Sequence, residues 1–383
     1  MRVALVGDEY YPDIGGASHY AFDLSLQLVK LGIEAVVITH AHPGQPEEEE
    51  IAGVKIKRVT GLVLNDPHRA VSPLLFHRCH KYIKDGNFDV VHGLDVYSSM
   101  ALMVIRFAHR HRIPCVLTCH TVMDSPFLIF LQRAMGLALS KADRLIAVSQ
   151  AAARFSHSLG FPEKRITVVP NGVDLSCFNG EMDASLMREE LGIGDEPLVV
   201  TASRLIKRKS PALLISAFAR VLKVVPDAKL VIAGSGREED NLSRQIKSLN
   251  IKNSVFMVGG LAKEKVAQLL AAADVFALPS EVESFGLALL EASAAGVPIV
   301  CSNSGGVPEV FQDGFNALLY PPGDDNAMAK AIICLIQDGE LAKTISANAV
   351  ETASKFTWEM AAKRTLRVYE EVLQENDSSR SHY

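Results

Sequence analysis

The sequence has no apolar run long enough to cross a bilayer. The nearest candidate, residues 127–139, is interrupted by Gln132 and Arg133, whereas a spanning helix needs about 20 apolar residues. The first residues, MRVALVG, form an expected strand with no apolar leader segment before it. The six cysteines include no Cys-x-x-Cys pair and no disulfide-framework spacing. We therefore expect a cytoplasmic protein whose only membrane contact is peripheral.

Three common phosphate-binding motifs are also missing. No Asp-x-Asp pair occurs, which disfavours a transferase that holds its donor through a divalent metal. The chain has no P-loop lysine motif, and the Gly-Ser-Gly at residues 234–236 lacks the third glycine of a dinucleotide fingerprint. The net charge of -5 gives no general attraction to nucleic acid. We expect neither a metal nor another cofactor, and no nucleic-acid partner.

What the chain does contain is two series of short β-branched runs that alternate with helical patterns, as in βαβ units around a parallel sheet. The length of 383 residues also favours two domains. The first series has expected strands at residues 2–6, 34–39, 54–59, 88–92, 114–118, 144–149 and 166–169. The second has them at residues 198–202, 229–233, 255–258, 275–278, 298–301 and 317–320. We predict an α/β fold with two parallel sheets.

An Asn-Gly-Val-Asp turn signal at residues 171–174 separates the two series. It predicts an N-terminal domain over 1–171, a linker over 172–196 and a second domain over 197–356. A final helix is expected over 357–375, and the pattern alone leaves open which domain it packs against. The polar tail, 376–383, is expected to be disordered.

The strongest functional signal lies at residues 279–286, PSEVESFG, where an expected strand ends and a helix begins. Ligands of open α/β sheets bind at this edge, and phosphates bind at helix N-termini. Ser284 is the expected N-cap, and Glu291 would lie about 9 Å further along the helix. Taken alone, Glu283 and Glu291 fit two exposed glutamates on an amphipathic helix equally well. The backbone amides offered to a phosphate would be those of Phe285, Gly286 and Leu287.

Two cations, Arg204 and Lys209, follow the first strand of the second series. Fixed positive charges at a strand end can neutralise a leaving diphosphate. For their neighbours Lys207 and Arg208, a solvated basic turn is the better interpretation.

The first series offers a glycine pair and a histidine at comparable positions. Gly15 and Gly16 lie between the first strand and the first helix, where a backbone without side chains can approach a phosphate, although paired glycines also form ordinary turns. His120 follows the strand at 114–118 and could donate a hydrogen bond to the transferred sugar or to its acceptor. A lone histidine is more often structural, but its place at a strand end favours a functional role.

Together these motifs resemble the family-4 glycosyltransferases, retaining enzymes of the GT-B architecture, over nearly the whole chain. The family's Glu-x7-Glu element is matched by Glu283 and Glu291. Its Arg-Leu and Lys-Gly elements are matched by Arg204 and Lys209, with Ser210 where glycine is usual. Further matches lie at residues 15–16, 171–174, 305–309 and 320–324.

The resemblance implies two Rossmann-like domains facing a central cleft, an acceptor-side N-terminal domain and a nucleotide-sugar-binding second domain. It also implies that the last helix returns to the N-terminal domain, and that the anomeric configuration is retained. The roles it implies are diphosphate binding for Arg204, Lys209 and Gly16, ribose binding for Glu291, and contacts with hydroxyls of the reacting sugar for Glu283 and His120.

The nucleotide base is expected near Leu261, within residues 258–263. Guanine offers N–H donors that match a carboxylate, and none occurs there before Glu264. The sequence therefore favours a UDP-sugar and leaves GDP-mannose open.

The acceptor is expected to be a hydroxyl compound. The segment 68–84 has apolar residues at 71, 75, 79 and 82 with cations elsewhere, which fits a helix resting on anionic lipid and equally a helix with a wet basic face. The N-terminal loop, residues 15–37, is similar to that of family members that glycosylate phosphatidylinositol, which favours a lipid-linked acceptor. Candidate acceptor-binding residues are Asp13, Ser18 and Arg69.

Two other functions are compatible with this architecture. A nucleotide-sugar 2-epimerase also binds a UDP-sugar between two Rossmann domains, but it changes the sugar without an acceptor. A non-catalytic nucleotide-sugar-binding protein needs no complete reaction centre, and is therefore the weaker alternative for a chain that has Glu283, Arg204, Lys209 and His120.

Overall fold

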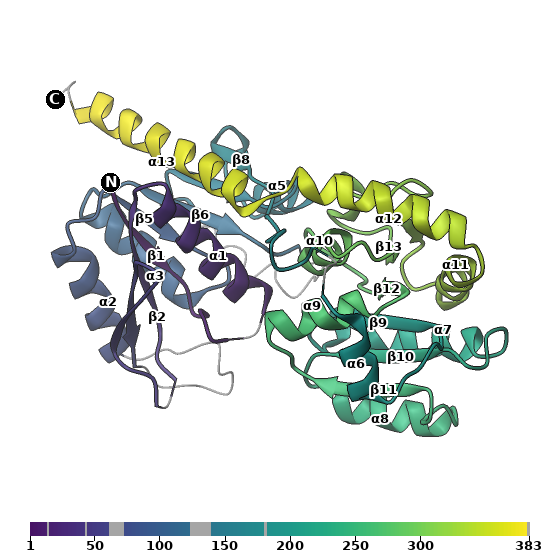
Figure 1. Cartoon of the computed structure of the whole chain (residues 1–383). Helices are drawn as coiled ribbons and strands as arrows, with labels where there is room; N and C mark the ends of the chain where they lie inside the picture. The colour runs from purple at the N-terminus through teal and green to yellow at the C-terminus, as the bar shows by residue number, and fades with distance from the viewer. Residues whose placement is uncertain (14, 43, 61–72, 123–138, 180–181, 381–383) are drawn as a thin grey trace. The chain divides into compact units, whose positions relative to one another are not determined.

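The computed structural model describes residues 1–13, 15–42, 44–60, 73–122, 139–179 and 182–380 (Figure 1). The chain divides into two compact units. Unit 1 consists of Met1–Asn171 together with Trp358–Tyr383, and unit 2 consists of Gly172–Thr357. Each unit is built around one sheet, and the α/β class with two parallel sheets is confirmed.

The sheet of unit 1 has the strand order β3-β4-β2-β1-β5-β6-β7-β8. All neighbouring strands are parallel except β3 and β4. The strands are β1 (Arg2–Val6), β2 (Glu34–His40), β3 (Glu48–Ile51), β4 (Val54–Val59), β5 (Val90–Gly93), β6 (Cys115–Cys119), β7 (Arg144–Ala147) and β8 (Ile166–Val168). The described helices include α1 (Gly16–Lys30), α2 (Pro73–Asp85), α3 (Ser99–Arg110), α5 (Gln150–Ser158), η1 (Glu163–Arg165) and α13 (Trp358–Arg380).

Unit 2 contains a parallel sheet with the order β11-β10-β9-β12-β13-β14. The strands are β9 (Leu198–Ala202), β10 (Lys229–Ala233), β11 (Val255–Gly259), β12 (Val275–Leu278), β13 (Ile299–Ser302) and β14 (Leu318–Tyr320). The helices are α6 (Ala184–Leu191), η2 (Lys207–Lys209), α7 (Pro211–Val221), α8 (Glu239–Ser248), α9 (Lys263–Ala271), α10 (Leu287–Ala294), η3 (Val307–Glu309), α11 (Asp325–Gln337) and α12 (Gly339–Ser354).

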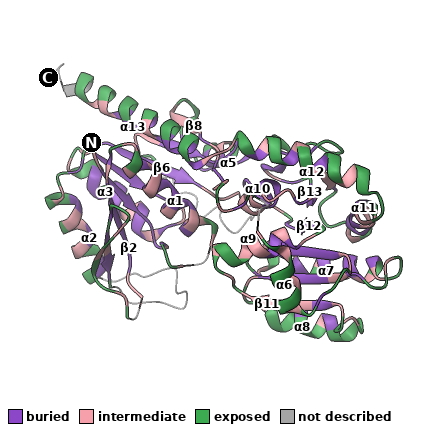
Figure 2. Cartoon of the chain, viewed as in Figure 1, coloured by how far each residue is buried: buried purple, intermediate pink, exposed green. Residues whose placement is uncertain are grey.

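The central strands of both sheets are buried along most of their length, whereas the edge strands β3, β8, β11 and β14 are only partly buried (Figure 2). In unit 2, Val199, Leu230 and Ile232 pack with Leu214 and Phe218 of α7 in one core. Each such side chain contributes about 1.5–3 kcal/mol through its removal from water. Because helices cover these sheets, the strands show continuous apolar runs rather than alternation.

The antiparallel edge strand β3 was not predicted, because its Glu-Glu-Glu-Ile sequence has the composition of a solvated segment. The partner strand explains why it forms. Glu48 lies opposite Lys57 in the register, and the two side chains form an ion pair of 2.9 Å. Cross-strand pairs of opposite charge stabilise a sheet by about 0.2–1 kcal/mol each. A strand of this kind depends on its neighbour and not on its own propensity.

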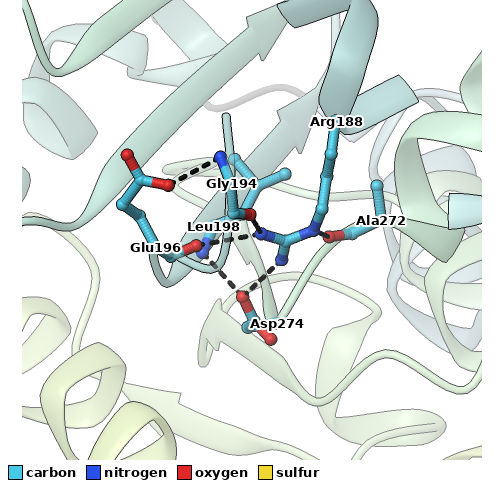
Figure 3. Close-up of polar contacts among 6 residues, drawn as sticks. All are labelled: Arg188, Gly194, Glu196, Leu198, Ala272 and Asp274. Carbon is cyan, nitrogen blue, oxygen red and sulfur yellow. Dashed lines mark hydrogen bonds and ion pairs between the residues drawn. The ribbon is translucent and has the colours of Figure 1, made fainter. Parts of the chain in front are cut away.

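The structure differs from the predicted linker over 172–196, because part of this stretch folds onto unit 2 as helix α6. Arg188 of α6 anchors the helix, as Figure 3 shows. The guanidinium of Arg188 donates hydrogen bonds to the carbonyl oxygens of Gly194 (2.6 Å), Glu196 (3.0 Å) and Ala272 (3.1 Å) and to the carboxylate of Asp274 (2.9 Å). The same Asp274 carboxylate accepts a hydrogen bond of 2.7 Å from the Leu198 amide, at the start of β9.

The chain end differs from the prediction as well. Residues 376–380, expected in a disordered tail, continue α13. Helix α13 packs against α1 and β7 within unit 1. A helix that is already nucleated and docked extends at little cost, so its polar last turn needs no packing of its own.

The two sheets share one topology. In each, the first strand is central and has the second parallel strand on one side and the fourth on the other. The strand order therefore reverses its direction between β1 and β5 in unit 1, and between β9 and β12 in unit 2. Each of these places is a topological switch point. Open α/β sheets bind ligands at the carboxyl end of such a switch point.

Candidate active site

A lysine and a glutamate meet at the switch point of unit 2. Lys209 lies in η2, shortly after β9, and Glu283 lies in the loop between β12 and α10. Their side chains form a short ion pair, and Ser280 Oγ donates a hydrogen bond of 3.2 Å to the same glutamate oxygen. Of the predicted site residues, these two are therefore in direct contact.

Glu283 is ionised in this environment. Burial raises its pKa, but the charge and hydrogen bond of Lys209, the charge of Arg208 and the Ser280 hydroxyl outweigh that effect, so the pKa lies below its ordinary value. The side chain is thus a buried carboxylate neutralised by an adjacent ammonium group. A second ligand of Lys209 can still bind, because an ammonium group has three N–H donors.

Arg204 follows β9 and is exposed. Within the part of the chain that the structure describes, its side chain makes no hydrogen bond or ion pair with a protein group. Ser210, which stands where the related family has glycine, has φ 46° and ψ 43°. This left-handed conformation explains the glycine preference, and serine adopts it at a cost of about 1–2 kcal/mol.

The β9 loop is held in place by the Gly-Ser-Gly segment after β10. The Leu205 amide donates a hydrogen bond of 2.9 Å to the Ser235 carbonyl. A Cβ atom on Gly234 would lie 1.9 Å from the Ser203 carbonyl oxygen. The segment that lacks a dinucleotide fingerprint therefore fits closely against the backbone on both sides of Arg204.

A second glycine pair supports the loop that carries Glu283. The Gly306 amide donates a hydrogen bond of 2.8 Å to the Glu283 carbonyl. A Cβ atom on Gly305, which has φ +58°, would lie 1.9 Å from the same oxygen. Only glycine fits this contact. The sequence match at residues 305–309 indicated a family motif but gave no sign of this role.

The predicted N-cap at Ser284 is wrong. Helix α10 begins at Leu287, and Gly286 is its N-cap with φ 95°. The side chain of Phe285 is buried beside the ring of Phe356 at 6.0 Å, and the chain turns at the next residue, Gly286. Glycine makes the turn without strain. Among the described residues, no side chain caps α10, so its backbone end is the feature available to an anion.

Glu291 lies one turn further along α10, near Asp174 of the Asn-Gly-Val-Asp turn and near Lys263, the last residue of the stretch predicted for the base. Asp174 and Lys263 form an ion pair of 3.3 Å. Burial, opposed by Lys263 and reinforced by Asp174, Glu264 and Glu291, raises the pKa of Cys177 to about 11. Four charged groups therefore surround this thiol. For Asp174, the only signal in the sequence was the Asn-Gly-Val-Asp turn. Leu261 lies between β11 and α9, half-buried.

His120 belongs to unit 1, directly after β6. Its ring lies 4.1 Å from that of Tyr20, edge to face. Burial lowers the pKa of His120 to about 3, while a hydrogen bond with the Leu94 backbone acts in the opposite direction. The Nε2 atom is shielded from water and has no hydrogen-bond partner among the described residues. A neutral imidazole with one unused nitrogen suits a hydroxyl group better than a charge.

The remaining predicted residues of unit 1 differ in availability. Gly16 is exposed and begins α1, with Gly15 as the N-cap. The Asp13 carboxylate lies 3.0 Å from His42 Nε2. Ser18 is buried, and its hydroxyl has no partner within the described residues. Arg69 lies outside the described residues.

No group of three or more His, Cys, Asp or Glu side chains in the described ranges could hold a metal ion. Each sheet has a switch point, and in unit 2 cationic side chains lie beside a helix start that has no side-chain cap among the described residues. α/β proteins that bind phosphorylated ligands have these features. Residues 14–176 match the family model described as Glycosyltransferase Family 4, and residues 183–352 match the model described as Glycosyl transferases group 1. The chain belongs to glycosyltransferase family 4, as the sequence resemblance predicted.

The chain is similar over almost its whole length to characterised relatives. It is 30% identical to N-acetyl-alpha-D-glucosaminyl L-malate synthase of Bacillus anthracis, covering 98% of this chain and 99% of the relative. It is 32% identical to the GDP-mannose-dependent alpha-(1-6)-phosphatidylinositol monomannoside mannosyltransferase of Mycolicibacterium smegmatis, covering 87% and 89%. The protein is accordingly a glycosyltransferase that uses a nucleotide sugar.

A solved structure supports the fold. The crystal structure of Anabaena HepE in complex with UDP and glucose superposes with a TM-score of 0.82 at 24% identity, covering 96% of this chain and 99% of that chain. The GT-B fold class is therefore confirmed.

Proposed function

We propose that this protein is a retaining hexosyltransferase that transfers a sugar from a UDP-sugar to a hydroxyl group of a lipid-linked acceptor. The observation that carries the proposal is the switch-point site of unit 2. There Lys209, after β9, pairs with Glu283, after β12, and Arg204 has no hydrogen-bond or ion-pair partner among the described residues. These groups provide two cations for a diphosphate and one carboxylate for sugar hydroxyls.

The proposed reaction exchanges one bond at the anomeric carbon. The bond to the phosphate oxygen breaks, the acceptor oxygen bonds on the same face, and the departing phosphate takes the acceptor proton. Arg204 and Lys209 stabilise the negative charge that develops on the diphosphate, so no metal is required. Glu283 accepts hydrogen bonds from sugar hydroxyls as an ionised carboxylate. His120 contributes its unused Nε2 to a hydroxyl of the same sugar.

Uridine is the proposed base because residues 258–263 contain no carboxylate for the N–H groups of guanine. The first candidate, Glu264, lies in the opening turn of α9. The neighbouring Lys263 is engaged by Asp174. Anabaena HepE, solved with UDP and glucose, supports this choice, whereas the mycobacterial relative is named as GDP-mannose-dependent. The experiment below therefore includes both bases.

Membrane contact is proposed through α2 and α3, but not through the apolar face predicted for residues 68–84. Leu75 and Cys79 of that face are buried in the fold. Leu74 and Phe76 are instead exposed. Burial, and the Coulombic effect of the nearby His111, Arg110, Lys84 and His77, lower the pKa of His80.

Exposed apolar side chains beside clustered cations suit an anionic bilayer surface. This contact is peripheral in the proposal. Among the described residues, no helix has the length and hydropathy needed to span a bilayer.

A donor panel tests the transfer. UDP-glucose, UDP-N-acetylglucosamine, UDP-galactose and GDP-mannose are each added to the full chain with phosphatidylinositol in mixed micelles. A donor at about 100 times its Kd should raise stability by about 2.7 kcal/mol, and a UDP-sugar should give a glycolipid. Transfer from GDP-mannose alone would overturn the uridine assignment. Conversion of a UDP-sugar in the absence of any acceptor would support the epimerase alternative.

Vesicle flotation tests the membrane contact. The chain is expected to float with phosphatidylserine vesicles and not with phosphatidylcholine vesicles, and less at high salt. Lys81→Glu with Lys84→Glu should abolish flotation, while Lys343→Glu with Lys355→Glu, at exposed positions on α12 and at its C-terminal end, is the control with the same change in charge. Equal flotation of the two variants would remove the α2 surface from the proposal.

A further inference from the structure

A chain of buried hydrogen bonds crosses unit 1 from α13 to α1. The Tyr369 hydroxyl lies 2.6 Å from His92 Nδ1, and His92 Nε2 lies 2.6 Å from Thr118 Oγ1. Thr118 Oγ1 in turn lies 3.3 Å from the Tyr20 hydroxyl. All four side chains are buried. They come from α13, β5, β6 and α1, so the chain joins segments that are as far as 277 residues apart in sequence.

His92 decides which groups donate and which accept in this series of hydrogen bonds. Burial, together with the nearby His120, lowers the pKa of His92 to about 3, so the imidazole is neutral near pH 7. A neutral imidazole has one donor nitrogen and one acceptor nitrogen. Tyr369 and Thr118 must therefore take opposite roles toward it, and loss of either hydroxyl leaves a buried nitrogen without a partner. Such a loss costs about 1–3 kcal/mol.

The series of hydrogen bonds ends beside His120. Thr118 precedes His120 by two residues, and in the register His92 pairs with Val116, two residues before Thr118. Alternation places His92 and Thr118 on one face of the sheet. Tyr20 contacts both Thr118, through its hydroxyl group, and His120, through its ring. The backbone of Leu94, two residues beyond His92, holds the imidazole of His120.

Helix α13 contacts this group a second time. The ring of Trp358, at the start of α13, lies 5.8 Å from the ring of Tyr20, edge to face. Tyr20 is thus packed between α13 and His120. Tyr20, which contacts His120, therefore also packs against a helix that completes unit 1 only after the whole of unit 2 has been synthesised.

We propose that His92, Thr118 and Tyr369 are positioning residues for sugar transfer. They hold Tyr20 and the end of β6 so that the unused Nε2 of His120 has one orientation, and they make that orientation depend on the docking of α13. This inference rests on the proposed role of His120. None of the three residues contacts the substrate in this assignment.

The decisive comparison is between two variants that loosen the same helix. Tyr369→Phe removes the hydroxyl that bonds to His92. Glu375→Gln weakens the ion pair that ties α13 to Arg144 at the surface. We expect Tyr369→Phe to lower kcat about fivefold to tenfold with donor KM within twofold. Glu375→Gln should leave kcat unchanged even where it lowers Tm by a similar amount.

The state of His120 provides a readout that stability alone does not move. In 15N-histidine NMR spectra of the full chain, wild-type His120 should show one neutral tautomer down to about pH 5, since burial keeps its pKa low. Tyr369→Phe and Thr118→Val should raise that pKa and give kcat a new decline at low pH. Thr118→Val is the second variant, because it keeps the shape of the side chain and serves if Tyr369→Phe folds poorly.

Two results separate the levels of the inference. If His120→Ala retains wild-type kcat, the proposed role of His120 fails. If His120→Ala is impaired while Tyr369→Phe and Thr118→Val keep wild-type kcat and an unchanged His120 spectrum, the positioning network is overturned and the role of His120 stands.

Discussion

The two units use one strand order but treat the same position of the sheet in opposite ways. In unit 2 the loop after the first strand carries Arg204 and Lys209, and α10 begins without a side-chain cap in the described structure. In unit 1 the loop after β1 carries Asp8, whose carboxylate accepts hydrogen bonds of 2.9 Å and 3.1 Å from the amides of Ser99 and Met100.

An internal carboxylate thus occupies, in unit 1, the place that an anionic ligand takes at a helix start. Ser98 also caps α3, accepting a hydrogen bond of 3.0 Å from the Ala101 amide. The comparison teaches that the sheet topology provides the location, while a few side chains decide whether it stays open to a phosphate.

The largest expected effect is on the cationic side of the comparison. Arg204→Ala should lower kcat by about two to three orders of magnitude, as loss of one charge partner of a transition state does. Steady-state kinetics with the best UDP-sugar measure it, and Tm should stay unchanged because Arg204 is exposed. Lys207→Ala, three residues away and also exposed, is the control with near-normal kcat. Near-normal turnover of Arg204→Ala would refute its role.

The next effect concerns the glycine that supports the unit 2 loop. Gly305→Ala should reduce stability by several kcal/mol and impair transfer, because its Cβ would lie 1.9 Å from the Glu283 carbonyl oxygen. Gly314→Ala also has positive φ but no atom within 4 Å of the added Cβ, so it should show only the backbone strain of about 1–2 kcal/mol. Urea unfolding compares the two, and equal losses would contradict the close-fit interpretation.

Asp8 should make the stability of unit 1 depend on pH. Burial raises its pKa to about 6, against hydrogen bonds from Met100, Ser99 and Ser98. A carboxyl whose folded pKa is raised contributes stability that is fully present below pH 3.8 and lost as pH rises through 6. The free energy of unfolding of Asp8→Asn relative to wild type should therefore rise by about 2 kcal/mol between pH 4 and pH 7.

Fluorescence can follow that transition, because Trp358 is the single tryptophan of the chain and belongs to unit 1. Urea titrations at pH 4, 5, 6 and 7 are sufficient. Parallel stability curves for wild type and Asp8→Asn would show that Asp8 titrates normally, and that the carboxylate in unit 1 is not held in a desolvated position.

The smallest expected effect separates donor binding from chemistry. Glu291→Ala should weaken binding of the UDP-sugar about tenfold, which corresponds to about 1.4 kcal/mol, with kcat changed less than Kd. Isothermal titration with UDP alone should show the same loss if the carboxylate contacts the ribose. Unchanged affinity would assign Glu291 to the charged group around Cys177 instead.

Much of the fold was predictable because its signals are local. Each strand in the two predicted series has an observed counterpart, with ends differing by one or two residues in several, as in β5, predicted over 88–92 and found at Val90–Gly93. The exceptions depend on partners. Strand β3 forms through charges on β4, and α6 forms where Arg188 reaches carbonyl groups on several segments.

The site was predictable to the same degree. Arg204, Lys209 and Glu283 could be identified because each lies directly after an expected strand, and parallel strands bring their ends to one edge. The N-cap at Ser284 was predicted wrongly, since the helix starts after a left-handed turn at Gly286, which the N-cap preference of serine does not indicate. The supporting contacts of Gly234 and Gly305 depend on loops that meet only across the sheet.

The sequence by itself determined the α/β class, the family and the strand ends that carry the charged residues, because these follow from periodicity and from short motifs. Only the tertiary structure decided that Asp8 fills the helix start of unit 1, that Lys209 neutralises Glu283, and that Tyr369 reaches His92 from the far end of the chain. The physical reason is that hydrogen bonds and ion pairs depend on distance in space, and burial then sets their strength.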